Sequence, residues 1–295
     1  MRIAHLSDPH LLSLEGARVR DFLSKRWIGG LNLLANRARA HRPEVFDAMV
    51  DDINAAGVDH VVCTGDLTNV ALPGELARAR AHLDRLALGP ARVTVVPGNH
   101  DAYVQAGVRL FAEQLGDYCA PDEGWAWPDG ARWPVVRVRG PVAIVGVSTS
   151  RQTPWFTAWG ELGAAQLERL ERALGDARLA GRFRLLAIHH PPAGAAAAHW
   201  RHGLRDRAAL AEVLGRVGAE LVLHGHEHLD LRAELAGPGG RAIPVRGIPS
   251  ATYAGHRAAE RAAYRIYTVG DEASGAGEEL RVWRRDGGGF SPASS

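Results

Sequence analysis

The chain has 295 residues, of which 46% are hydrophobic and 23% are charged, and these ordinary fractions exclude a chain that is disordered as a whole. Its 35 Lys and Arg residues against 33 Asp and Glu leave a net charge of +2, too small to indicate nucleic acid as a partner. The two cysteines, Cys63 and Cys119, are too few for a disulfide framework or a cysteine-based zinc site. Because no apolar run reaches the ~18 residues of a membrane span and the N-terminus lacks a signal-peptide pattern, we expect a cytoplasmic protein.

The first third of the chain alternates short apolar runs with apolar residues at helical spacing. Proline opens both helical patterns, at positions where a helix can begin. In chain order, the predicted elements are a strand at 3–6, a helix at 43–57, a strand at 58–63, a helix from Pro73 and a strand at 92–96. This alternation is typical of βαβ units with parallel strand pairing.

The rest of the chain continues in the same way, with less regular spacing. The predicted elements are strands at 133–139 and 141–147, a helix at 161–174, a strand at 183–188, a helix at 208–217, strands at 220–223, 231–235 and 241–245, and a hairpin of 262–268 with 279–283. Because no shift in composition divides the chain, we predict one domain over 1–285 and a disordered tail over 286–295.

Polar residues that can bind metal recur just after five of the predicted strands. The carboxyl ends of parallel strands form the usual ligand crevice of an open α/β sheet. Asp, Asn and His together suit Zn, Fe or Mn, and seven candidates exceed what one tetrahedral ion needs. Two ions that share a bridging carboxylate would use them all. The five segments are Asp8-Pro9-His10, Gly65-Asp66-Leu67-Thr68-Asn69, Gly98-Asn99-His100-Asp101, His189-His190-Pro191-Pro192 and His224-Gly225-His226-Glu227-His228.

In this order the segments resemble the calcineurin-like metallophosphoesterase superfamily, whose pattern is D-x-H, G-D-x-x-[DN], G-N-H-[DE], a His before Pro, and G-H-x-H. The motifs cover residues 8–228, and no ligand position departs from the pattern. The resemblance implies an α/β fold of two packed mixed β-sheets flanked by helices, a four-layer αββα sandwich. The His189-His190-Pro191-Pro192 form and the chain length look most like the bacterial phosphodiesterase branch that includes cyclic nucleotide phosphodiesterases.

The resemblance also implies a role for each matching residue. One metal would be held by Asp8, His10 and His228, and the other by Asn99, His189 and His226, with Asp66 as the bridge. A hydroxide shared by the two ions would attack phosphorus.

Two further residues of the third motif, His100 and Asp101, would serve the reaction without binding metal. His100 would stabilise the developing oxyanion or protonate the leaving group, and Asp101 would orient His100.

Several further residues are candidates for substrate contact, each with a structural alternative. His190 could contact substrate or pack beside Pro191, and Asn69 could support a ligand loop or a turn. His199 and Arg201, beside Trp200 on a predicted loop, could grip a phosphate and stack a base, or they could be solvated.

Two more features have a structural and a functional interpretation. His224, next to the last motif, is expected to support the ligands or to pack, and not to coordinate metal. The tryptophans between 125 and 159 are expected to pack in the core or on helices, with an apolar substrate wall as the alternative.

The segment 19–42 mixes seven large apolar residues with arginines and one lysine. Such a basic amphipathic insertion suits peripheral contact with a membrane or cover over a lipid-bearing substrate. The alternative is a structural lid or a subunit contact, and the oligomeric state stays open.

The function that we expect is hydrolysis of phosphodiester bonds in small-molecule or cyclic-nucleotide substrates. The alternative is pyrophosphate hydrolysis in a nucleotide–lipid conjugate of the UDP-diacylglucosamine type, which the segment 19–42 motivates. A non-catalytic scaffold is disfavoured, because all seven ligand types are present.

Overall fold

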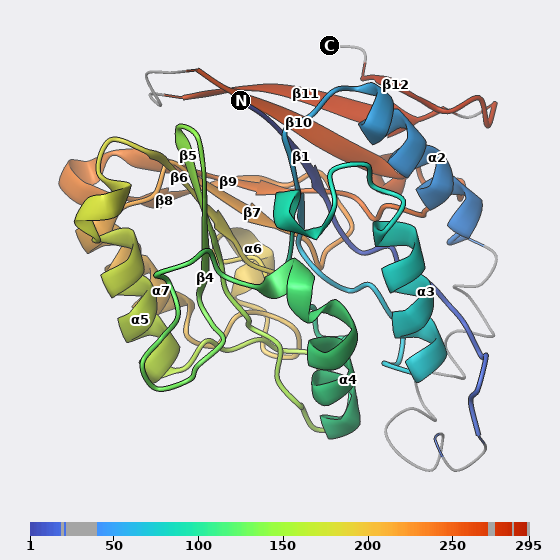
Figure 1. The fold of residues 1–295 in the computed structure, drawn as a ribbon, viewed down its shortest axis with the longest axis horizontal. Coiled ribbons are helices and arrows are strands. Elements are labelled where there is room, and N and C mark those ends of the chain that lie inside the picture. Colours follow the sequence, from blue (N-terminus) through green and yellow to red (C-terminus); the bar gives the residue numbers. More distant parts are fainter. Residues whose placement is uncertain (19–20, 22–39, 271–274, 285, 294–295) are drawn as a thin grey trace.

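Within residues 1–18, 21, 40–270, 275–284 and 286–293, which the computed structural model describes, two six-stranded β-sheets form the centre of the fold (Figure 1). The first sheet has the order β12-β11-β10-β1-β2-β3. Its parallel half contains β1, β2 and β3, and its other pairings are antiparallel. The strands are β1 (Arg2–Leu6), β2 (His60–Cys63), β3 (Val93–Val95), β10 (Ala263–Val269), β11 (Ala276–Trp283) and β12 (Phe290–Pro292).

The second sheet has the order β4-β5-β6-β7-β9-β8. Strands β5, β6, β7 and β9 are parallel, and an antiparallel strand closes each edge. The strands are β4 (Val135–Arg139), β5 (Val142–Gly146), β6 (Phe183–Ala187), β7 (Leu221–His224), β8 (Arg232–Ala236) and β9 (Ala242–Gly247). Both sheets are mixed, as the sequence predicted.

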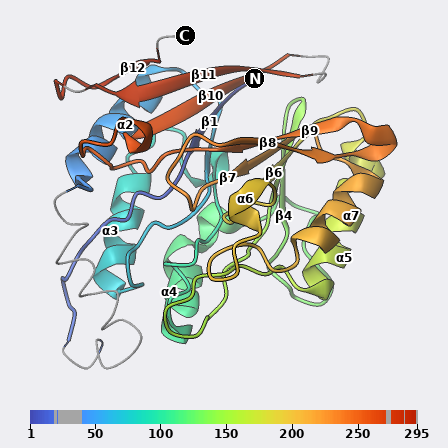
Figure 2. The same ribbon diagram turned by 180° about the vertical axis from the view of Figure 1, so that it is seen from behind.

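Helices cover the outer face of each sheet, so the molecule has four layers (Figures 1 and 2). The first sheet packs on α2 (Pro43–Ala55), α3 (Pro73–Leu83) and α4 (Gln105–Leu115), and the second on α5 (Ala164–Leu174) and α7 (Arg207–Val217). A third apolar cluster joins the inner faces, where Ile3 and Val62 of one sheet meet Leu185 of the other. Burial of each such apolar side chain stabilises the folded state by roughly 1.5–3 kcal/mol.

The predicted strands and the late hairpin are confirmed, but three elements differ from the prediction. The helix α4 was not predicted, because neither a proline nor a capping side chain marks its start, although Gly107, Phe111 and Leu115 recur every four residues on its buried side. The four-residue helix α6 (Gly194–Ala197) lies in a stretch that was predicted without structure. The predicted disordered tail is wrong for residues 290–292, because they pair with β11 and Phe290 is buried against Tyr264 and Trp283.

Two predictions about the chain as a whole are not tested here. The amphipathic segment 19–42 lies almost entirely outside the described residues, so its role stays a prediction. The extent of the single domain also stays a prediction. Among the helices of the described residues, none combines the length and the apolar character that crossing a membrane requires.

Candidate metal centre

All seven predicted ligands lie in the loops that follow β1, β2, β3, β6 and β7. Backbone hydrogen bonds hold these loops against one another, from Asp8 N to Gly65 O at 2.9 Å and from Gly225 N to His189 O at 3.1 Å. Because Gly65 and Gly98 touch backbone to backbone, a Cβ on Gly65 would lie 2.4 Å from the Gly98 nitrogen. The two glycines therefore allow the second and third loops to approach closely.

The backbone of the ligand loops is strained. Among the described residues, seven that are not glycine have positive φ, and five of these are predicted ligands. Such a conformation costs an L-residue about 1–3 kcal/mol and persists only where the surroundings impose it. The five are Asp8 (53°), His10 (46°), Asp66 (55°), His226 (73°) and His228 (56°).

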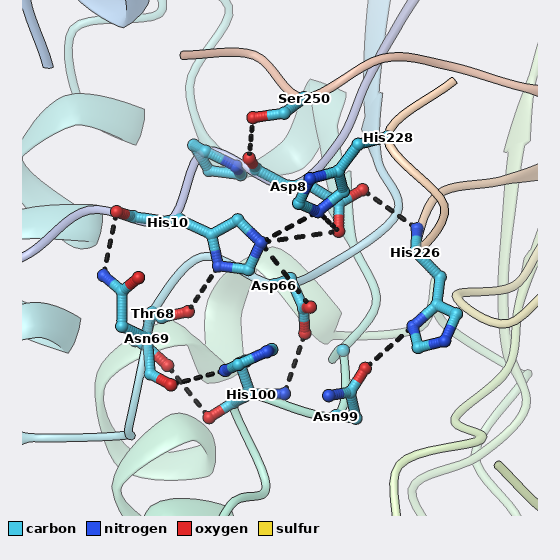
Figure 3. Close-up of polar contacts among 12 residues, drawn as sticks. Asp8, His10, Asp66, Thr68, Asn69, Asn99, His100, His226, His228 and Ser250 are labelled. Carbon is cyan, nitrogen blue, oxygen red and sulfur yellow. Dashed lines mark hydrogen bonds and ion pairs between the residues drawn. The ribbon is translucent and has the colours of Figure 1, made fainter. Parts of the chain in front are cut away.

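The first cluster consists of Asp8, His10 and His228 (Figure 3). The Nε2 atoms of the two imidazoles lie 3.0 Å apart, and His228 Nε2 lies 3.3 Å from Asp8 Oδ1. Asp8 Oδ1 is buried and has no hydrogen-bond partner within the described part of the chain. Lone pairs that converge in this way need a cation among them, so this cluster fits a metal ion.

The second cluster consists of Asn99, His189 and His226. Asn99 Oδ1 lies 2.9 Å from His226 Nδ1 and 3.1 Å from His189 Nε2, and these two nitrogen atoms are 3.2 Å apart. An amide oxygen beside two imidazole nitrogens is a donor set that suits Mn, Fe or Zn. This cluster therefore also fits a metal ion.

Asp66 lies between the two clusters with one carboxylate oxygen toward each. Its Oδ2 is 3.8 Å from His10 Nε2, and its Oδ1 is 3.5 Å from His189 Nε2. Its Oδ1 also accepts a hydrogen bond from the His100 backbone N–H at 2.8 Å. The carboxylate can therefore contact both ions, which is what a bridging ligand must do.

Backbone carbonyls set the tautomer of two ligand imidazoles. His10 Nδ1 donates to the Thr68 carbonyl at 3.1 Å, and His189 Nδ1 donates to the Thr64 carbonyl at 2.7 Å. In both rings the lone pair is therefore left on Nε2, the nitrogen that faces the cluster.

Burial and neighbouring charge adjust the ionisation of the site. Desolvation lowers the pKa of His189, and lowers that of His226 well below its ordinary value, so both rings are neutral and able to ligate. Burial alone would raise the pKa of Asp8, but the His228 imidazole outweighs it and holds the pKa below its usual range. The Asp8 carboxylate and the imidazoles of His189 and His226 are thus in the states that metal binding requires.

His100 stands beside the first cluster, and one of its ring nitrogens lies within 4.8 Å of ligand atoms of His10 and Asp66. Its Nδ1 donates to the Asn69 carbonyl, its ring lies 5.0 Å from that of His10, and Tyr103 stacks on it at 5.8 Å. Asp101, which is predicted to orient His100, makes no hydrogen bond to the His100 ring among the described residues. The Asp101 carboxylate instead accepts hydrogen bonds from Gly98 N at 2.9 Å and from Thr68 N and Oγ1 at 3.0 Å, and so ties two ligand loops together.

The structure separates the predicted substrate contacts into two kinds. Asn69 is buried and donates to the His10 carbonyl at 2.9 Å, so it supports a ligand loop. His190 is buried and bonds Thr149 Oγ1 at 2.7 Å and the Ala158 carbonyl at 2.9 Å, so both of its nitrogens are used within the protein. For these two residues the contacts agree with the structural alternatives, and substrate contact stays a prediction. His199 and Arg201 are exposed and accessible.

Two further imidazoles lie near the clusters: His41, which has no predicted role of its own, and His202, which ends the run His199-Trp200-Arg201-His202 that could contact a phosphate. The ring of His41 lies 5.6 Å from that of His10, and its Nδ1 lies 2.9 Å from Thr252 Oγ1. The ring of His202 lies 5.9 Å from that of His226. Both residues belong to segments without a motif, so only the fold shows that they lie near the clusters. The buried His224 bonds the Gly225 carbonyl, in keeping with its predicted supporting role.

Comparison with known proteins agrees with this geometry. The calcineurin-like phosphoesterase family matches residues 1–230, whereas no curated protein matches the chain significantly. A dimetal phosphatase from Danio rerio has a TM-score of 0.62 and 14% identity, over 98% of this chain and 96% of its own. Purple acid phosphatase from yellow lupin seeds has a TM-score of 0.65 and 12% identity, over 99% and 52%.

A third similar structure is the NAD nucleotidase of Haemophilus influenzae, with a TM-score of 0.53 and 12% identity over 100% of this chain and 60% of its own. At such identities the similarity concerns the fold alone. The family match is broader, because it covers more than half of the chain and all five motifs. The chain therefore belongs to the calcineurin-like phosphoesterases, metal-dependent hydrolases of phosphate esters with a binuclear metal centre.

Proposed function

We propose that this chain hydrolyses phosphodiester bonds in small-molecule substrates, cyclic nucleotides among them. The observation that carries the proposal is the convergence of two donor clusters on one shared carboxylate, Asp66. In this proposal, Asp8, His10 and His228 would hold one metal ion, Asn99, His189 and His226 would hold the other, and Asp66 would contact both. When bound, the ions supply Lewis-acid activation of the phosphate and of water.

The part of His100 in the reaction follows from its tautomer. Its Nδ1 carries the hydrogen that the Asn69 carbonyl accepts, so Nε2 is the nitrogen that can transfer a proton. Its ring lies beside the first cluster, where a phosphate oxygen or a leaving group would stand. We therefore assign His100 to charge stabilisation and proton donation at the leaving group, and Asp101 and Asn69 to holding the loops that position it.

A substrate panel with added Mn²⁺ tests the proposal. The panel contains a chromogenic diester, the matching monoester, cyclic nucleotides and a UDP-linked lipid. We expect the diesters to be cleaved with a higher kcat/KM than the monoester. The Asp66→Asn protein is the control for contaminating activity. Turnover of the monoester alone would contradict the proposal and indicate a phosphomonoesterase.

Pyrophosphate cleavage in a nucleotide–lipid conjugate is the second candidate function. The exposed aromatic side chains Trp155, Phe156 and Trp200 favour it, because an apolar substrate would need such a surface. The UDP-linked lipid in the panel decides between the two functions: preference for it over every diester would replace the first proposal. A cytoplasmic location and contact through residues 19–42 stay predictions.

A further inference from the structure

Two loops beside the second metal cluster pair with each other along their backbones. Ala158 N donates to Arg201 O at 2.8 Å, Gly160 N donates to Gly203 O at 3.0 Å, and Arg205 N donates to Gly160 O at 2.9 Å. The pairing is parallel, with a bridge between Gly160 and Leu204. Residues that precede the paired stretch in either loop therefore lie at the same end of the pair.

That end carries an unusual concentration of exposed aromatic rings. Among the described residues, five large hydrophobic side chains are exposed, and three of them precede this paired stretch. Trp155 is 57% exposed, Phe156 is 71% exposed and Trp200 is 70% exposed. We call these three side chains the aromatic rim. The prediction that Trp155 packs in the core or on a helix is thus not met.

The turn that exposes two residues of the aromatic rim has a strained backbone. Trp155 and Phe156 are the central residues of a turn that Thr157 N closes by donating to Pro154 O at 3.2 Å. Phe156 has φ of 65°, a conformation that favours glycine at this turn position and strains a bulky side chain. The Thr153 and Thr157 hydroxyls fasten the turn through hydrogen bonds of 2.6 and 2.8 Å. A strained, fastened turn that exposes a phenyl ring indicates a function for that ring.

The charge around the aromatic rim is positive. The two loops, 149–163 and 193–208, contain four arginines and two acidic residues. The Asp206 carboxylate accepts from the backbone N–H groups of Leu162 and Gly163, and Glu161 lies 3.9 Å from Arg151. The Arg201 guanidinium lies over the Trp200 ring at 4.7 Å, and both side chains are exposed. Exposed Trp and Phe beside Arg is the composition that proteins present to the headgroup region of a bilayer.

The aromatic rim also lies close to the metal centre. The Ala158 carbonyl accepts from His190, whose ring is 4.5 Å from that of His226. His202, two residues after Trp200, lies 5.9 Å from the same ring. We propose that the aromatic rim docks the protein on an anionic lipid bilayer. The metal centre would then face phosphate esters that are held in the bilayer surface. This inference concerns a surface outside the catalytic residues and does not depend on the proposed function.

Vesicle sedimentation of the full chain tests the inference. The wild type should bind vesicles that contain phosphatidylglycerol and bind pure phosphatidylcholine vesicles less well. Combined substitution Trp155→Ser, Phe156→Ser and Trp200→Ser should lower the partition coefficient by at least about tenfold. Val108→Ser is the matched control, because Val108 is 45% exposed on α4 and should leave binding unchanged. Turnover of a chromogenic diester that has no nucleobase should be retained in all variants.

A second variant separates function from folding. Phe156→Gly relieves the strained φ, so it should raise the melting temperature while weakening vesicle binding. Vesicle binding that is unchanged in the triple variant, or weakened equally by Val108→Ser, would overturn the inference. So would a triple variant that binds vesicles normally but has a raised KM for a nucleotide diester, because the aromatic rim would then contact the nucleobase. A wild type that cleaves the diester but binds no vesicles overturns this inference alone.

Discussion

His100 is held at two points, by its backbone N–H on Asp66 and by its Nδ1–H on the Asn69 carbonyl. We therefore expect His100→Ala to lower kcat by about 10²–10⁴, the usual contribution of a positioned acid–base group. The variant should keep both metal ions if the seven predicted ligands suffice, although His100 also lies within 4.8 Å of ligand atoms of His10 and Asp66. Elemental analysis beside the rate measurement checks this. Loss of one equivalent of metal would make His100 a ligand and contradict its assignment.

Sequence reasoning succeeded for residues whose role depends on local order. The ligands follow strand ends at fixed spacing, so their convergence could be predicted before the fold was known. It left alternatives open for side chains whose role depends on partners far along the chain. His190 and Asn69 have the chemistry of substrate contacts, but Thr149, Ala158 and His10 take up their polar groups. His41 and His202 reach the site only through the tertiary fold.

At the scale of elements, the start of α3 depends on one buried carboxylate. Glu75 accepts hydrogen bonds from the backbone N–H groups of Asn69, Val70 and Leu72 at 3.0–3.3 Å, and so links the helix to the second ligand loop. Glu75→Gln should lower the free energy of unfolding by about 1–3 kcal/mol, because buried N–H groups lose acceptors. Urea unfolding measures the change. Glu44→Gln, in the exposed first turn of α2, should change it little.

The same residue gives a pH dependence of known sign. Burial raises the pKa of Glu75 above its ordinary value, despite the hydrogen bonds that lower it. Since the folded pKa exceeds the unfolded one, its contribution to stability is complete below the unfolded pKa and declines as pH rises through the folded pKa. The difference in unfolding free energy between the wild type and Glu75→Gln should therefore shrink as the pH rises. A difference that grows with pH would contradict the assigned shift.

Elements with a marked start or a continuous apolar run could be predicted, and elements without either could not. Helix α2 buries five residues at helical spacing, and both its existence and its start were predicted. Helix α4 has neither a proline nor a capping side chain at its start, and β12 is a three-residue edge strand that depends on β11 for its hydrogen bonds. Exposure of Trp155 and Trp200 had no signal in the sequence, because tryptophan composition alone favours burial.

At the scale of the molecule, the metal centre joins the two sheets. Asp8, Asp66 and Asn99 follow strands of the first sheet, whereas His189 and His226 follow strands of the second. Metal ions that bind only the folded chain should stabilise it, by about 2.7 kcal/mol at a free concentration of about 100 times Kd. We expect Mn²⁺ to raise the melting temperature and a chelator to lower it. Asp66→Asn should reduce this response, and Asp59→Asn, an exposed control, should keep it.

Anomalous diffraction from crystals loaded with Mn²⁺ tests the binuclear centre most directly. We predict two peaks, one among Asp8, His10 and His228 and one among Asn99, His189 and His226, with Asp66 in contact with both. The second peak should weaken or disappear in crystals of Asn99→Ala, while the first persists. One peak in the wild type, or peaks that lie away from these side chains, would contradict the assignment.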